Sequence, residues 1–241
     1  MRVKAVIAYD GSFFRGFQKQ TKTQNTITTA IESALKSLHI HSDTVGSGRT
    51  DTGVHATGQV IHFDLPDFWV DLERLQRELN RKLKHIRIKH ITQTSDTFHA
   101  RFSAKRRIYR YIFKRQRPSI FEENHIAHYP AFDTRRVQQA LQAFEGEHDF
   151  RYFYKTGSHA HTTIREIYKT NYKQFGDYHI LYFEANGFLR AQVRMMIDAA
   201  MKCANGDITL KMLKEQIDTT HHHTTSLAPP SGLYLARIIY G

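Results

Sequence analysis

The chain has 241 residues, of which 40% are hydrophobic and 24% charged, a balance that excludes disordered and fibrous classes. Lysine and arginine number 35 against 23 aspartate and glutamate, so the formal net charge is +12 and the expected partner is acidic, such as a nucleic acid. The single cysteine, Cys203, cannot form an internal disulfide and fits the cytoplasm, and no segment has the ~20 apolar residues that span a membrane.

The first half of the chain is predicted to form elements in the order β-α-β-α-β-β. Val3, Ala5, Ile7 and Tyr9 fall at alternate positions, which is typical of a strand. Apolar residues at helical spacing follow from residue 27, with Thr26 as the expected N-cap. The predicted strands lie at residues 3–9, 60–65, 86–91 and 98–104, and the predicted helices at 27–38 and 72–83.

The second half repeats a similar mixture of strands and helices. Strands are predicted at residues 109–113, 164–172, 178–184 and 233–240, and helices at 137–144, 189–204 and 210–217. Short links between neighbouring strands favour antiparallel pairing. We therefore expect an α+β fold with two similar halves, residues 1–105 and 106–241. Each half is a mostly antiparallel sheet covered by helices, and the active-site cleft is expected between them.

The densest group of chemically useful side chains lies in residues 46–56, GSGRTDTGVHA. Glycines there allow close approach of the backbone to a ligand, and Arg49, Asp51 and His55 lie within seven residues of one another. A structural turn explains the same composition, because Asp and Gly are also common turn residues. Composition alone leaves both interpretations open.

The motif decides between them, because GRTDTGVHA closely resembles the signature loop of the TruA family of tRNA pseudouridine synthases. Further segments match the family in the expected order, so the resemblance covers essentially the whole chain. They are YDGSFFRGFQKQ at residues 9–20, FHARFSA at 98–104, YRY at 109–111, GEHDF at 146–150, GFLRAQVR at 187–194 and APPSGLY at 228–234.

The resemblance implies a role for individual residues. Asp51 is the catalytic nucleophile, Arg194 pairs with it, and Tyr109 lies against the target base. A guanidinium beside a carboxylate favours its ionised form, which a nucleophile needs. For binding the RNA we expect Arg49 and the basic run that includes Arg106 to contribute. The alternatives are a core packing role for Tyr109 and a surface position for Arg194.

The implied activity is the isomerisation of uridine to pseudouridine at positions 38, 39 and 40 of the anticodon stem-loop of tRNA. The resemblance also implies a cytoplasmic homodimer that needs no cofactor. Whether Asp51 attacks C1′ or C6, or removes a proton from C2′, is open at this point.

Two other functions, metal binding and RNA binding without catalysis, could explain parts of the same sequence. Histidines at 221–223 and in the pair His159 and His161 could bind a metal, but the chain has no Cys-x-x-Cys zinc motif, so no metal is expected. A non-catalytic basic RNA-binding protein would explain the charge and the tyrosines equally well. An acidic residue such as Asp51 does not help a loop to bind phosphate, because both groups are negatively charged. The Asp51 loop therefore favours an enzyme over a protein that only binds RNA.

Overall fold

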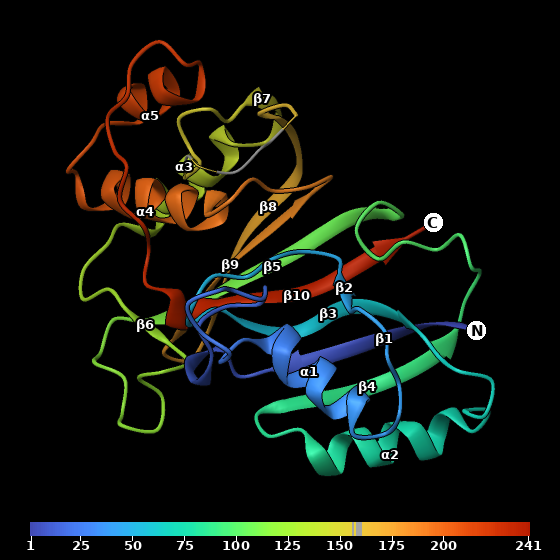
Figure 1. The fold of residues 1–241 in the computed structure, drawn as a ribbon. Helices are drawn as coiled ribbons and strands as arrows, with labels where there is room; N and C mark the ends of the chain where they lie inside the picture. Colours follow the sequence, from blue (N-terminus) through green and yellow to red (C-terminus); the bar gives the residue numbers. More distant parts are fainter. Residues whose placement is uncertain (156, 158–160) are drawn as a thin grey trace. The chain divides into compact units, whose positions relative to one another are not determined.

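The computed structural model describes residues 1–155, 157 and 161–241, which form two compact units (Figure 1). Unit 1 comprises Met1–Lys105 and Tyr234–Gly241, and unit 2 comprises Arg106–Leu233. The last strand, which the sequence predicts within residues 106–241, belongs to unit 1 beyond Leu233. Among the described residues there is no helix with the length and apolar character needed to cross a membrane.

Unit 1 contains a sheet with the strand order β4-β1-β3-β10. These strands are β1 (Arg2–Tyr9), β3 (His55–Asp64), β4 (Ile86–Gln93) and β10 (Leu233–Tyr240), and the short β2 (Val45–Gly46) pairs with β3. Strand β1 is antiparallel to both of its neighbours. The last strand returns parallel to β3 and sets Tyr234 opposite His55, which explains why it belongs to this unit.

Two helices, α1 (Ile27–Lys36) and α2 (Leu72–Lys82), lie against this sheet (Figure 1). Their apolar side chains and those of β1 form the core of the unit; Val3, Ala5, Ile7, Ile27, Ile31, Leu35, Leu75 and Leu79 are all fully buried. The predicted N-cap is confirmed, because the Thr26 side chain accepts a hydrogen bond from the Thr29 N–H at 3.2 Å.

The predicted strand at residues 98–104 is wrong, because the chain turns there and β5 (Ala104–Lys114) begins only at the end of that segment. The His99 ring accepts hydrogen bonds at 3.2 Å from the N–H groups of Arg101 and Phe102. A side chain that satisfies neighbouring N–H groups stabilises a turn against a strand. The alternation of apolar residues in this segment therefore reflects turn packing.

Unit 2 has the strand order β5-β9-β8-β7, with every neighbouring pair antiparallel. The strands that follow β5 are β6 (Ala127–His128), β7 (Gly146–Asp149), β8 (Ile164–Phe175) and β9 (Tyr178–Ala185), and β6 pairs parallel with β5. Helices α3 (Thr134–Ala143), α4 (Gln192–Asn205) and α5 (Leu210–Ile217) complete the unit. The α+β class and the mostly antiparallel pairing are confirmed.

Candidate active site

The loop that carries Asp51 enters β3 and is held by residues at the end of β1 and just after it. The Tyr9 phenol and the Thr50 hydroxyl form a buried hydrogen bond of 2.8 Å. The Phe17 N–H donates to the Thr50 carbonyl at 3.0 Å, and the Val54 N–H donates to the Asp51 carbonyl at 3.1 Å. The backbone on both sides of Asp51 is thereby fixed, and Asp51 itself is half-buried.

Gln59 of β3 holds the start of the same loop from within the core. Its amide nitrogen donates to the Gly48 carbonyl at 2.6 Å, and its amide oxygen accepts from the Gly48 N–H at 3.3 Å. The side chain is fully buried, so these bonds satisfy polar groups that water cannot reach. Gly48 is thus fixed one residue before Arg49.

Two glycines allow the segment after β1 to pack against this loop. A Cβ atom on Gly11 would lie 2.0 Å from the Val54 carbonyl oxygen, which no side chain can tolerate. Gly16 has a φ of +102°, a conformation that favours glycine, and a Cβ there would lie 3.2 Å from the Thr50 carbonyl oxygen. The two motif segments, residues 9–20 and 48–56, therefore form one packed structure.

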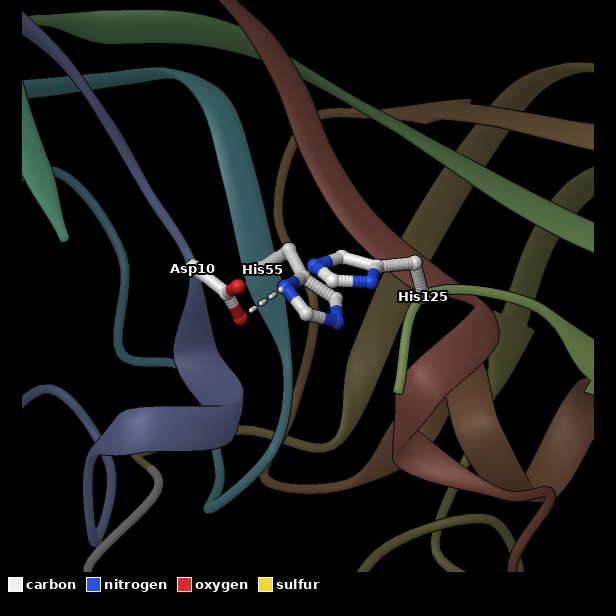
Figure 2. Close-up of side chains that lie close together, drawn as sticks. All are labelled: Asp10, His55 and His125. Carbon is white, nitrogen blue, oxygen red and sulfur yellow. Dashed lines mark ion pairs between the residues drawn. The ribbon is translucent and has the colours of Figure 1, made fainter. Parts of the chain in front are cut away.

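Asp10 and His55 face one another beside this loop (Figure 2). Asp10 Oδ1 lies 3.2 Å from His55 Nδ1, and the Gly11 N–H donates to the same ring nitrogen at 3.1 Å. The His55 side chain is only 1% exposed, and its ring stacks on Tyr234 with 4.8 Å between centroids. The Nδ1 atom of His55 therefore faces both a carboxylate oxygen and a backbone N–H group. The sequence motifs assign no role to Asp10, although Asp10 lies in the motif at residues 9–20 and His55 in the motif at residues 48–56.

Tyr109 lies on β5 in unit 2, opposite Phe183 of β9. The residue is 7% exposed, and its ring meets the Phe188 ring edge to face, with 5.2 Å between centroids and an interplanar angle of 86°. Edge-to-face contact fixes the plane of an aromatic ring. Tyr109 is therefore held in one orientation, as both its predicted base-stacking role and the core alternative require.

Arg194 lies in the first turn of α4 and is tied to the segment that precedes β10. Its Nε donates to the Ala228 carbonyl at 2.8 Å, and the Ala228 N–H donates to the Arg194 carbonyl at 3.1 Å. The residue that precedes the helix, Ala191, has a φ of 61° in the left-handed region. This backbone conformation sets the direction in which α4 begins.

Arg106 already has an acidic partner within unit 2. Its guanidinium forms an ion pair with Glu184 at 2.8 Å and lies 5.0 Å from the centroid of the Tyr168 ring. The hydrogen bond that Arg106 donates to the Glu184 carboxylate raises the pKa of Arg106. An RNA phosphate at Arg106 must therefore share or replace this carboxylate.

The predicted site residues divide between the units. Asp51 and Arg49 lie in unit 1, with Arg49 exposed, and Tyr109, Arg106 and Arg194 lie in unit 2.

The triple histidine at residues 221–223, considered as a metal site from the sequence, lies in unit 2. His223 Nε2 is 2.9 Å from Glu215 Oε2, and the His222 ring stacks on Tyr152 with 4.7 Å between centroids. His159 lies outside the described residues. The triple histidine is thus engaged in contacts inside unit 2.

Comparison with known proteins places these motifs in a family context. A family model described as tRNA pseudouridine synthase matches residues 5–103 and 140–241. The tRNA pseudouridine synthase A of Campylobacter jejuni subsp. jejuni is 39% identical over 242 residues, covering 100% of each chain. The enzymes of the same name from Helicobacter hepaticus and Pseudothermotoga lettingae are 40% and 37% identical, covering 98% and 97% of each chain.

Proposed function

Because the chain belongs to the tRNA pseudouridine synthase family and is an isomerase, we propose that it converts uridine to pseudouridine at positions 38, 39 and 40 of the anticodon stem-loop of tRNA. The observation that carries the proposal is the Asp51 loop. Its GRTDTGVHA motif is anchored by Tyr9, Phe17 and Gln59, which fix its backbone before and beside Asp51. A fixed backbone holds a nucleophile in one place for attack on a bound substrate.

In the proposed reaction Asp51 is the nucleophile. Its carboxylate attacks the nucleoside, the bond between N1 of the base and C1′ of the sugar breaks, and the detached uracil turns within the site. A new bond then forms between C5 and C1′, and the bond between the Asp51 carboxylate and the nucleoside breaks, which frees the enzyme. The hydrogen on C5 is lost as a proton while N1 gains one. Reactant and product are isomers, so the reaction needs neither an oxidant nor a reductant, and we propose that it proceeds without a cofactor.

The other site residues are proposed to act around Asp51. Tyr109 offers its ring to the target base, which enzymes that modify bases take out of the stack. Arg194 supplies the positive charge that favours an ionised carboxylate. Arg49 and Arg106 bind the RNA backbone, and Arg106 exchanges Glu184 for phosphate when it does so. These assignments rest on the motif resemblance and on the local geometry within each unit.

We propose tRNA as the partner and the cytoplasm as the place of the reaction. The excess of 12 positive charges favours binding of a polyanion, and the names of the relatives specify tRNA. By the same resemblance, the enzyme acts as a homodimer.

The test of this function is to map pseudouridine in tRNA from cells with and without the protein. We expect pseudouridine at positions 38, 39 and 40 to disappear when the gene is deleted and to return when it is restored. A non-catalytic RNA-binding protein would leave these modifications unchanged, and that result would contradict the proposal.

A further inference from the structure

An open groove of about 510 Å³ lies in unit 1, apart from the Asp51 loop. It is lined by residues of α1 and the residue after it, by the end of α2 and the link to β4, and by Phe13, Phe14 and Asn25 between β1 and α1. Every residue that lines the groove belongs to unit 1.

An exposed pair of aromatic rings marks this groove. The Phe13 and His85 rings stack with 3.5 Å between centroids and an interplanar angle of 11°. Phe13 remains 50% exposed, although burial of such a ring is favourable. The pair therefore presents a flat aromatic surface to the solvent.

The backbone on both sides of this pair is fixed before any ligand binds. The Asn25 amide nitrogen donates to the Phe13 carbonyl at 2.9 Å. His85 has a φ of 61°, a costly conformation for a residue other than glycine, and its carbonyl accepts from the Asp10 N–H at 3.0 Å. A preorganised surface loses little entropy on binding.

The chemistry around the rings matches that of a nucleotide. Lys82 and Lys84 line the groove, and the described residues that line it include no carboxylate. Ser33 of α1 adds a hydroxyl group that can donate to or accept from the edge of a base. The hydroxyl of Ser37, which follows the helix, donates to the Ala34 carbonyl at 2.8 Å and can still accept. Stacking surface, hydrogen-bonding groups and positive charge are the three features with which proteins hold unpaired nucleotides.

We infer that this groove is a second RNA-binding subsite, which stacks one unpaired nucleotide of the tRNA substrate on Phe13 and holds its phosphate with Lys82 and Lys84. The inference rests on the proposed function for the identity of the RNA. It assigns to the groove a share of tRNA affinity that is separate from the chemistry at Asp51.

Filter binding of unmodified tRNA to the full chain tests this subsite. Phe13→Leu keeps the apolar volume but removes the aromatic face, so the Kd for tRNA should rise about five- to hundredfold. Phe13→Tyr restores a stacking face and should keep the wild-type Kd. Lys84→Gln should make the dependence of log affinity on log salt shallower by about 0.7, the value for one phosphate of a single strand.

Phe68→Leu is the matched control, because Phe68 is 63% exposed in unit 1 but does not line the groove. Wild-type affinity in Phe13→Leu, or equal weakening in Phe68→Leu, would overturn the subsite. If Phe13→Leu melts early, the salt dependence of Lys84→Gln decides, and an unchanged slope overturns it. Binding is measured without turnover, so a wild-type protein that binds tRNA but does not isomerise it would refute the proposed function alone.

Discussion

The Tyr9 phenol and the Thr50 hydroxyl form a buried hydrogen bond of 2.8 Å, although the residues are 41 positions apart in the chain. Tyr9 is the last residue of β1, and Thr50 directly precedes Asp51. The bond therefore connects the sheet of unit 1 to the residue next to Asp51, on which the proposed chemistry depends.

Removal of this bond should reduce both stability and turnover. Tyr9→Phe leaves the Thr50 hydroxyl buried with one partner fewer, so the free energy of unfolding should fall by about 1 kcal/mol, and kcat should fall more than tRNA affinity does. A double-mutant cycle of Tyr9→Phe and Thr50→Val measures the coupling by urea unfolding. Effects that add without coupling would show that the bond does not hold the loop.

Stability should decrease in acid because of His62. This residue of β3 is 5% exposed, and its Nδ1 accepts from the Ala100 N–H at 3.0 Å. Burial, and next the charge of Arg2, lower the pKa of His62 from 6.5 to about 4. A lowered pKa means that the unfolded chain takes up the proton first, so this contribution is complete above pH 6.5 and is lost as the pH falls toward 4.

The loss over this window amounts to about 3 kcal/mol. His62→Asn keeps an acceptor near the Ala100 N–H but cannot titrate, so its unfolding free energy should vary less with pH than that of the wild type. Urea unfolding at several pH values between 7.5 and 4 provides the comparison. Identical pH profiles for the two proteins would contradict the assignment.

Much of the fold could be predicted from local patterns. Alternation of Val3, Ala5 and Ile7 predicted β1, and Thr26 before an amphipathic segment predicted the start of α1; both are confirmed. The segment at residues 98–104 has a similar alternation but turns, because the His99 ring accepts from backbone N–H groups of the residues that follow it. Periodicity records which residues are apolar, and it does not record such local hydrogen bonds.

The sequence motifs predict which residues belong to the candidate site, but not the contacts between them. The segments around Asp51 and Asp10 were recognised separately, but the contact of Asp10 with His55 joins residues far apart in sequence, and no local pattern reports it. Arg106 illustrates the same limit. Its basic neighbours predicted a phosphate contact, while its partner Glu184 lies 78 positions further along the chain.

Substitutions of Tyr109 should show whether the residue stacks on the target base or only packs in the core. Tyr109→Phe keeps the ring and its contact with Phe188, so base binding should be preserved. Tyr109→Ala should lose about 1 to 3 kcal/mol of binding, the value of one base stacked on an aromatic ring. Thermal melting beside the activity assay provides the control. If Tyr109→Ala unfolds at the assay temperature while Tyr109→Leu folds and is fully active, Tyr109 is only a core residue.

Binding of tRNA should weaken steeply as salt increases. Each neutralised phosphate contributes a slope of about −0.7 on single strands and −0.9 on duplex DNA to the dependence of log affinity on log salt. The net charge of +12 leads us to expect several such contacts. Affinities measured by filter binding between low and physiological salt provide the slope, and a slope near zero would remove the electrostatic part of the account.

The most direct test of the central claim is the release of tritium from C5 of uridine in tRNA by Asp51→Asn. Asn is nearly isosteric with Asp. The Val54 N–H donates its hydrogen bond to the backbone carbonyl of residue 51, which the substitution leaves in place, so the loop should keep its conformation. A neutral amide is a far weaker nucleophile and base than a carboxylate. We predict a folded variant that binds tRNA with near wild-type affinity and releases no tritium. Release at close to the wild-type rate would contradict the assignment of Asp51 as the nucleophile.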